Sequence, residues 1–293
     1  MACDLELAGF APVSPDDWQA DVVVRGAPTP CVLDGAEAGG PTWAMRPGRF
    51  LLHVPGIARF LLRDGAAIDY EAETDAAPGD LAAFLIGAAF GILLHQRGLV
   101  TVQASSVRVD GKAALFLGPS GAGKSTLAAG LARRGRQFLG DDFCVISLDA
   151  GGAPRVQPDG GRLKLWAEAI DALGLAHQCA GPVRSRLQKF HVGPPAEATE
   201  ALPLGPAYAL RDARAPRKAG IQRPNVVDAA LLIRSNAYRP GVVRRLAQAR
   251  AYFEIATAVG NGSGAFNLAR DLDLSRIDET LDALEAHWAG AAP

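Results

Sequence analysis

A glycine-rich segment with a single lysine, GPSGAGKS at residues 118–125, carries the clearest chemical signal in the sequence. It matches the pattern G-x-x-x-x-G-K-[ST] at every fixed position, between an apolar run typical of a strand and a run that favours a helix. Glycines allow the backbone to wrap around an anion so that amide N–H groups point at phosphate oxygens, and the helix adds its positive end. The segment therefore predicts a nucleotide-binding loop.

The residues of this loop have distinct expected roles. Lys124 would place its ammonium group against the β- and γ-phosphates, and the Ser125 hydroxyl would be a ligand of Mg²⁺. The residues expected to contact the nucleotide are Gly118, Pro119, Ser120, Gly121, Ala122, Gly123, Lys124, Ser125 and Thr126. Loops of this kind occur in ATPases, GTPases and several classes of kinase, so the loop alone does not name the reaction.

Two adjacent acids, Asp141 and Asp142, follow the next apolar run, RQFLG. At the carboxyl end of a strand in an α/β sheet they would lie beside the nucleotide, and successive side chains of an extended strand point to opposite sides. One acid could then accept the proton of the acceptor hydroxyl while the other holds Mg²⁺. The alternative is one metal-holding acid with a solvated neighbour.

The elements that must position these residues indicate an α/β fold with two parts. The runs RFLLHV and ARFLLRDGAAIDYEA predict strands in the first 75 residues. A buried helix is expected from a cap at Asp80 to about residue 97. We therefore expect a smaller β-rich region over 1–97 and a catalytic domain over 98–293.

Within the second part, the Asp110-Gly111 pair predicts a hairpin that leads into the loop, and a helix should run from residue 124 to about 134. The stretch GGAPRVQPDGGRLKLW suggests a hairpin, and residues 175–222 suggest long loops with a strand near PAYAL. The C-terminal part is predicted to be helical, with Phe253 on an apolar face and a capping box formed by Ser275 and Asp278.

The composition argues against several classes of function. Lys and Arg number 30 against 31 Asp and Glu, and this net charge of −1 gives no basis for a nucleic-acid partner. The four cysteines have no metal-type spacing. The longest apolar run, 81–94, is shorter than the roughly 20 residues that span a bilayer, and the N-terminus lacks the pattern of a secretory signal. We expect a cytoplasmic protein with no membrane partner.

The stretch LGPSGAGKSTLAAGLARRGRQFLGDDFCVI resembles the HPr serine kinase/phosphorylase family, in which an Asp-Asp pair follows the loop after one helix and one strand. The resemblance implies a P-loop kinase core of the HPr kinase/phosphoenolpyruvate carboxykinase-like type, with ATP and Mg²⁺ as cofactors. It implies that Lys124 is catalytic, that Asp141 is the base and that Asp142 supports Mg²⁺ together with Ser125. The reverse assignment of the two acids stays open.

A longer stretch, LLHQRGLVTVQASSVRVDGKAALFLGPSGAGKSTLA, is similar to HPr-kinase-like proteins encoded with lasso-peptide biosynthetic clusters, as are the fragments LKLW and LDALEAHW. Those kinases phosphorylate the C-terminal serine of a ribosomally made precursor peptide. The resemblance therefore implies an ATP- and Mg²⁺-dependent serine kinase whose partner is a peptide or small protein. HPr-type enzymes are hexamers, which leaves a homo-oligomer open.

One position departs from the family pattern. The strand before the loop usually carries a His in an LHAS-like context, where this chain reads VQAS with Gln103. Histidine can share a proton or a charge with phosphate, whereas glutamine can only hydrogen-bond. Because Lys124, Ser125 and both acids are present, we expect activity to be retained. The glycine-rich signature that contacts HPr is not recognisable, which argues against HPr as the acceptor.

Basic residues elsewhere are weaker candidates for contacts with substrate or phosphate. Arg184, Arg186 and Lys189 in VRSRLQKFHV could bind an anion or form a solvated loop. Arg234 and Arg239 follow an apolar helix and could reach the site. Two other functions stay open: a small-molecule kinase on the same scaffold, and a non-catalytic ATP-binding protein with a regulatory or assembly role.

Overall fold

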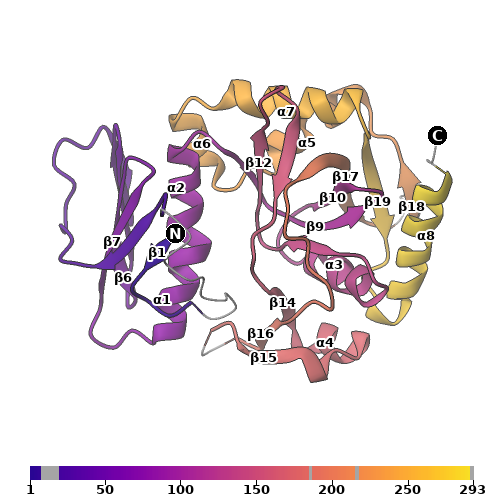
Figure 1. The fold of residues 1–293 in the computed structure, drawn as a ribbon, viewed down its shortest axis with the longest axis horizontal. Helices are drawn as coiled ribbons and strands as arrows, with labels where there is room; N and C mark the ends of the chain where they lie inside the picture. The colour runs from indigo at the N-terminus through magenta and orange to yellow at the C-terminus, as the bar shows by residue number, and fades with distance from the viewer. Residues whose placement is uncertain (8–19, 185–186, 215–217, 291–293) are drawn as a thin grey trace. The chain divides into compact units, whose positions relative to one another are not determined.

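The computed structural model describes residues 1–7, 20–184, 187–214 and 218–290, which form a mixed α/β fold (Figure 1). The chain divides into two units. One consists of Met1–Leu99 with Pro182–Leu187, and the other of Val100–Gly181 with Gln188–Pro293. Each unit is built around sheets of its own, and the glycine-rich loop belongs to the second unit.

The first unit contains a seven-stranded sheet in the order β1-β2-β7-β6-β5-β4-β3. Its strands are β1 (Ala2–Cys3), β2 (Val23–Gly26), β3 (Ala38–Gly40), β4 (Trp43–Arg46), β5 (Arg49–Val54), β6 (Ala58–Arg63) and β7 (Ala67–Ala72). Strands β3 to β7 form an antiparallel meander, in which buried and more exposed residues alternate along β6. This alternation is typical of a sheet with one face in the core. The predicted strands at 49–54 and 58–72 are confirmed.

A continuous helix follows this sheet, made of α1 (Pro78–Phe84), a π-helical segment η2 (Leu85–Phe90) and α2 (Gly91–Gln96). The predicted helix is confirmed, but its predicted cap is wrong. Pro78 opens the helix, since its missing N–H would be unpaired in the first turn anyway, and Asp80 lies within that turn. Pro78–Gln96 is long and apolar enough to cross a membrane, yet 56% of its most apolar window is buried inside the protein, as in a core helix.

The second unit contains a nine-stranded sheet in the order β11-β9-β10-β17-β13-β12-β8, with β19 paired to both β17 and β18. Its strands are β8 (Val100–Val102), β9 (Ala104–Val109), β10 (Lys112–Leu117), β11 (Phe138–Gly140), β12 (Cys144–Leu148), β13 (Pro154–Gln157), β17 (Leu202–Asp212), β18 (Gly220–Gln222) and β19 (Ala265–Arg270). Strands β10, β17 and β19 are parallel, and β11 runs in the same direction because it and β10 both pair antiparallel with β9. The carboxyl ends of these four strands therefore share one edge.

Helices cover both faces of this sheet: α3 (Lys124–Arg133) and α8 (Ile277–Gly290) on one, and α5 (Val226–Ser235) and α7 (Ala249–Asn261) on the other. Helix α4 (Ala167–Leu173) packs against α3. Strand β10 is a continuous apolar run in the sequence because both of its faces are buried. Phe116 packs into the core on the α3 side, whereas Leu115 and Leu117 pack into the core on the α7 side. The predicted hairpin is confirmed, because Asp110 and Gly111 both have positive φ and join β9 to β10.

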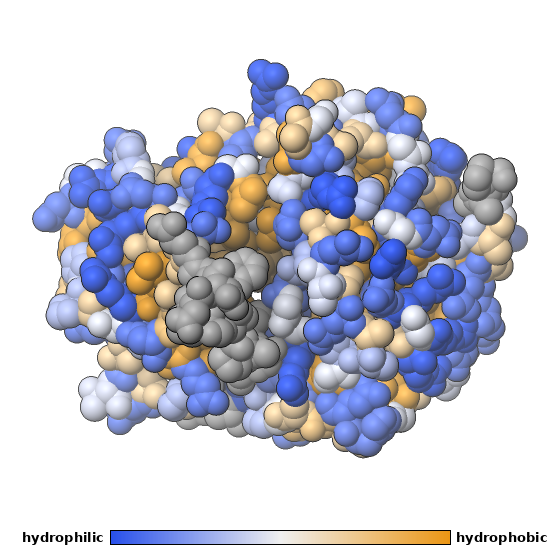
Figure 2. All heavy atoms as spheres, in the orientation of Figure 1, coloured by the Kyte–Doolittle hydropathy of each residue, from blue (hydrophilic) through white to orange (hydrophobic). Residues whose placement is uncertain are grey.

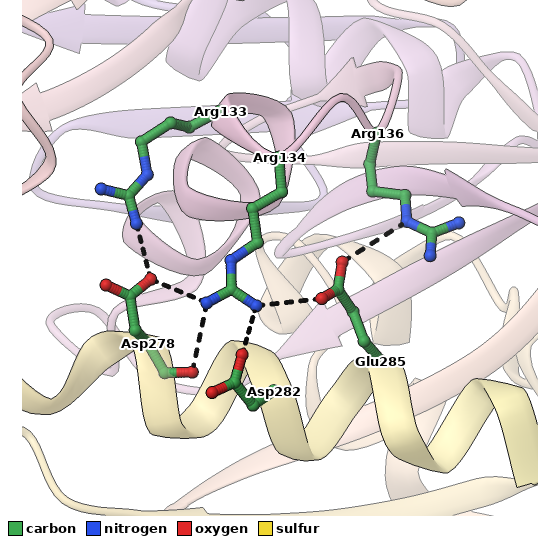
Figure 3. A network of polar contacts seen from close by, with 6 residues as sticks. All are labelled: Arg133, Arg134, Arg136, Asp278, Asp282 and Glu285. Carbon is green, nitrogen blue, oxygen red and sulfur yellow. Dashed lines mark hydrogen bonds and ion pairs between the residues drawn. The ribbon is translucent and has the colours of Figure 1, made fainter.

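Helix α8 packs along α3, and ion pairs between the two helices add to this contact. A Cβ at Gly130 of α3 would lie 2.9 Å from Cδ1 of Leu281 in α8, so glycine lets the Leu281 side chain pack close to α3. The contact is then extended by ion pairs between arginines at the C-terminal end of α3 and carboxylates of α8 (Figure 3). The residues in this network are Arg133, Arg134, Arg136, Asp278, Asp282 and Glu285.

Three predictions about the second unit are wrong. Strand β13 pairs with β12 and β17, and β14 (Leu163–Trp166) joins a separate three-stranded sheet, so GGAPRVQPDGGRLKLW is not one hairpin. That sheet also takes β15 (Cys179–Pro182) and β16 (Lys189–Val192) from the segment expected to be loops. The Phe253 side chain is 64% exposed, because Tyr252 and Ile255 form the buried face of α7.

The expected capping box before the last helix is also wrong. Asp273, rather than Ser275, caps the short 3₁₀ turn that leads into α8, since its carboxylate accepts the Ser275 N–H at 2.9 Å. The helix itself and its buried face are confirmed: Ile277, Leu281 and Trp288 all lie in the core.

Polar side chains predominate over the face viewed in Figure 2, as expected because charged and polar residues mostly stay exposed to solvent.

Candidate functional site

The glycine-rich loop connects the end of β10 to the start of α3. Gly118, Gly121 and Gly123 have φ of 153°, 81° and 80°, a region of backbone conformation that favours glycine, and Gly123 directly precedes the helix. A hydrogen bond closes the loop, because the Ala122 N–H donates to the carbonyl of Pro119 at 3.2 Å. The residues predicted to contact nucleotide therefore form one compact strand–loop–helix turn at the shared sheet edge.

Lys124, the first residue of α3, bends back over this loop. Its ammonium group donates to the carbonyl oxygens of Gly118 and Pro119, each at 2.9 Å. Burial lowers the pKa of Lys124, and nearby carboxylates offset this only in part. Two neutral carbonyls are weak partners for a buried cation, so the lysine is poised to exchange them for an anion.

Asp141 lies buried against the first turn of α3. One carboxylate oxygen, Oδ1, accepts the Ser125 hydroxyl at 2.7 Å and also the Ser105 hydroxyl. The other, Oδ2, accepts the backbone N–H of Lys164 at 3.1 Å. The structure therefore brings the loop serine and the first acid into direct contact, from segments sixteen residues apart.

Asp142 points away from its neighbour. Its φ is 71°, so the chain leaves the extended conformation directly after β11 and the two carboxylates diverge. Oδ2 of Asp142 accepts the Lys164 ammonium at 2.5 Å, and the Lys189 ammonium lies 3.8 Å from Oδ1. Burial opposes ionisation of Asp142, but the charges of Lys164 and Lys189 hold its pKa below its usual value.

A third acid, Asp159, holds the backbone of Asp141 in place. Its Oδ2 accepts the Asp141 N–H at 2.9 Å and its Oδ1 accepts the Gly161 N–H at 2.8 Å. A Cβ at Gly140 would lie 3.0 Å from the same carboxylate, so the strand end fits closely over it. Burial, together with the charge of Asp141, raises the pKa of Asp159 to about 6 although both N–H groups favour the ionised form.

The β14–β16 pair presents one polar face toward Asp142. Lys164 pairs with His191 and Trp166 with Lys189, and directly opposed residues of antiparallel strands point to the same side. The opposite face, which contains Leu163, enters the core beside α3. Burial and the neighbouring cations lower the pKa of His191, and its Nδ1 is buried without a partner. Trp166 is 48% exposed beside the two lysines.

Lys164 and Asp159 are the main residues that the sequence analysis missed. LKLW entered it only as part of an expected hairpin and as a fragment of a resemblance, and Asp159 lies in the PDGG turn of that expected hairpin. Tyr238 was also missed. Its ring packs 5.3 Å from the ring of Phe143, and burial raises its pKa within the field of Asp142 and Lys164.

The remaining predicted candidates lie in different places. Gln103 precedes Ala104, the partner of Leu117, so it lies at the loop's edge of the sheet, where its N–H donates to the Asn236 carbonyl at 2.7 Å. The guanidinium of Arg239 lies 5.7 Å from the ring centre of Tyr238, whose pKa the charges of Asp142 and Lys164 also affect.

Two arginine candidates are not gathered at the loop by any contact within the described residues. Arg234 lies exposed in the last turn of α5. Arg184 contacts residues of the first unit, with its Nε 3.4 Å from an Asp80 oxygen and its guanidinium 4.7 Å from the Phe84 ring centre. Arg186 lies outside the described residues.

The donor set at the loop fits Mg²⁺ bound together with a nucleotide. Among the residues that the structure describes, no group of three or more His, Cys, Asp or Glu side chains gathers as a self-contained metal site. Ser125 and Asp141 nevertheless offer two adjacent hard oxygen donors. Mg²⁺ commonly takes one or two protein oxygens and completes its shell with water and phosphate oxygens, which suits this pair.

Comparisons with known proteins add little to this geometry. No family model matches the chain, and no curated protein matches it in sequence. A solved structure of the HPr(Ser) kinase/phosphatase from Coxiella burnetii is similar over 65% of this chain and 97% of that one, at 13% identity and a TM-score of 0.32. A likeness of this degree establishes neither fold nor activity.

Proposed function

We propose that this protein is an ATP- and Mg²⁺-dependent phosphotransferase that transfers the γ-phosphoryl group to a serine hydroxyl. The observation that carries the proposal is the contact of Asp141 with Ser125 next to a second, separately held carboxylate, Asp142. A loop that only bound nucleotide would need the first acid alone. A second, half-buried carboxylate, balanced by two lysines at the same edge, supports a site where a hydroxyl reacts.

The loop would hold the triphosphate. Backbone N–H groups of residues 118–125 and the N-terminus of α3 attract phosphate oxygens. Lys124 would exchange the carbonyls of Gly118 and Pro119 for the β- and γ-phosphates, whose negative charge would balance its buried ammonium group. Ser125 and Asp141 would hold Mg²⁺, whose bound charge neutralises the phosphate oxygens.

The geometry favours Asp142, rather than Asp141, as the acid on the acceptor side. Asp141 is already engaged by Ser125, Ser105 and the Lys164 N–H, whereas Asp142 faces the polar side of β14 and β16. Asp142 would orient the serine hydroxyl and take its proton as transfer proceeds. A lowered pKa is compatible with this role, because a loose transition state needs little help from a strong base.

The polar face of β14 and β16 would serve the acceptor and the transferring group. Lys164 and Lys189 lie against Asp142, so they are placed to neutralise negative charge as the phosphoryl group moves. Trp166 offers an exposed aromatic surface on that face, which suits a peptide better than a closed small-molecule pocket. The resemblance of the sequence to lasso-peptide kinases suggests the C-terminal serine of a precursor peptide as the acceptor.

Transfer to peptides tests the proposal. The full chain is incubated with ATP, Mg²⁺ and peptides that end in serine, and phosphorylation is measured by mass spectrometry. We expect Asp142→Asn to lower kcat by about 10²–10⁴-fold while ATP binding is kept. Asp141→Asn should instead raise the Mg²⁺ concentration needed for half-maximal rate.

Asp149→Asn is a matched control, since Asp149 is exposed and accepts only the N–H groups of its own turn. It should change neither property. ATP binding without transfer to any peptide or small molecule would contradict the proposal and favour a non-catalytic ATP-binding protein. Transfer to a small molecule alone would contradict the peptide acceptor, and an Asp142→Asn variant with normal kcat would remove Asp142 from the mechanism.

A further inference from the structure

Arg270, the last residue of β19, lies buried behind the glycine-rich loop with only 4% of its surface exposed. Its Nη2 donates to the Ala122 carbonyl at 2.7 Å, and its Nη1 donates to the Asp271 carbonyl at 3.2 Å. Its Nε is buried without a partner, and no carboxylate among the described residues lies within ion-pair distance of the guanidinium. A buried arginine held only by carbonyls is rare, because buried charges are usually paired.

The guanidinium also occupies the space where a side chain of Gly123 would lie. A Cβ built at Gly123 would be 1.9 Å from Nη2 of Arg270, and the φ of 80° at this position is itself unfavourable for other residues. Gly123 is therefore favoured by its backbone conformation, and a larger residue there would displace the guanidinium of Arg270. The contact is specific to this turn of the loop, since Arg270 reaches it from a strand that ends 148 residues further along the chain.

The hydrogen bond to Ala122 determines how one peptide group is oriented. The Ala122 carbonyl and the Gly123 N–H belong to the same trans peptide, so they point in opposite directions. When Arg270 holds the carbonyl on its own side, the Gly123 N–H is turned to the other side. In a glycine-rich loop the direction of such N–H groups decides whether the loop can receive an anion.

The charge of Arg270 also favours the binding of an anion to the loop. Burial lowers the pKa of Arg270, and the charges of Asp212 and Asp271 offset this only in part. Strand pairing of Arg270 with Asp212 places both at the carboxyl edge of the sheet, beside the loop. A cation that is incompletely balanced in the empty protein gains most from an anion bound nearby, so its burial makes the unliganded loop more receptive to phosphate.

We propose that Arg270 is a positioning residue of the phosphate loop, which holds the Ala122–Gly123 peptide in its anion-receiving orientation and supplies a cation that bound polyphosphate balances. The inference rests on the proposed function only in that the loop binds the phosphates of a nucleotide. It assigns no contact between Arg270 and the transferred group. The effect should therefore fall on binding of phosphate rather than on the rate of transfer.

Binding and stability of Arg270 variants test this proposal. Arg270→Gln should weaken the binding of Mg²⁺-ATP and of inorganic tripolyphosphate by at least about tenfold, measured by calorimetry. Its kcat at saturating ATP should stay near that of the wild type. The unliganded Tm should be unchanged or higher, because a buried and unbalanced charge is removed. Arg270→Lys, which keeps the charge and one donor, should restore most of the affinity.

Arg211→Gln is the matched control, since Arg211 lies on the neighbouring strand and donates to Asn267 instead of the loop. It should leave both affinities unchanged. Wild-type affinity in Arg270→Gln, with or without a lowered Tm, would overturn the proposal. Should this variant not fold, Arg270→Met replaces it with the same readouts. ATP binding by the wild type without transfer would contradict only the proposed function, whereas absence of binding to both ligands would overturn both.

Discussion

The cations at the two ends of helix α3 have different partners: carboxylates at the C-terminal end and neutral carbonyl groups at the N-terminal end. At its C-terminal end, Arg133, Arg134 and Arg136 meet three carboxylates of α8, and Arg134 alone contacts all three of them (Figure 3). At its N-terminal end, the ammonium of Lys124 is held by two carbonyl oxygens. Arg270, next to the same end, likewise has only carbonyl partners among the described residues.

The difference follows from what each end must do. The macrodipole of a helix is positive at its N-terminus, where further cations are unfavourable unless an anion joins them. Cations at the C-terminus are favourable, and there the carboxylates of α8 are already present. The arginines thus stabilise the contact between two helices. Lys124 and Arg270 instead lack a paired carboxylate among the described residues, so a bound phosphate group can balance their charges. Substitutions at the N-terminal end should therefore affect nucleotide binding and transfer, whereas substitutions at the C-terminal end should affect the free energy of unfolding.

The largest effect is expected for Lys124→Met. The variant loses the ammonium that reaches into the loop, so we expect kcat/KM for ATP-dependent transfer to fall by at least about 100-fold. Its unliganded free energy of unfolding should not decrease, because a buried cation with a lowered pKa is replaced by an apolar side chain of similar length. Steady-state kinetics and urea unfolding measure the two properties.

Lys112→Met serves as the control, since Lys112 is exposed at the other end of β10 and hydrogen-bonds Ser263. It should leave transfer and ATP affinity as they are. A Lys124→Met variant that is strongly destabilised, or that transfers phosphate at the wild-type rate, would show that Lys124 has the same structural role as the arginines at the far end of the helix.

A smaller effect, on stability alone, is expected from pH through Asp159. Its pKa rises from the ordinary 3.8 to about 6 in the folded protein, so the protonated form is favoured by folding. The stability that Asp159 contributes is complete below about pH 4 and is lost as the pH rises through 6, by about 3 kcal/mol over the two pKa units. In Asp159→Asn this loss should be absent, while the amide oxygen can still accept one N–H.

Urea unfolding between pH 4 and pH 8, without metal or nucleotide, measures the difference. The free energy of unfolding of Asp159→Asn relative to wild type should rise across this range. Asp149→Asn, an exposed turn acid, should give a curve parallel to that of the wild type. Parallel curves for Asp159→Asn as well would mean that the carboxylate keeps an ordinary pKa despite its burial.

Parts of this site could be predicted because they depend on local pattern. The loop follows from fixed spacing, and the acids were placed at its edge because a strand that follows a helix commonly returns in the same direction. Even so, the two acids were expected to diverge by alternation along a strand. They diverge instead because Asp142 adopts a positive φ, which no residue pattern around it indicates.

The residues that were missed depend on pairing between distant segments. Lys164 reaches Asp142 because β14 pairs with β16, twenty-odd residues later, instead of folding back on β13. Arg270 reaches the loop because β19 lies in parallel beside β17. Hydrophobic periodicity reports which face of a strand is buried, but it does not choose the neighbouring strand. A charged residue at a strand end can therefore be recognised as a site residue only when the sheet order is known.

The smallest effect is expected for Arg134→Ala, at the paired end of α3. This variant removes the guanidinium that joins Asp278, Asp282 and Glu285, and networks of partly exposed ion pairs contribute little each. We expect the free energy of unfolding to fall by about 1 kcal/mol, and by less at high salt, because screening already weakens these pairs. ATP affinity and kcat should not change, since the Gly130–Leu281 contact still holds the two helices together. Loss of ATP affinity in this variant would mean that the two ends of α3 are coupled, and that charge pairing at one end sets the geometry of the loop at the other.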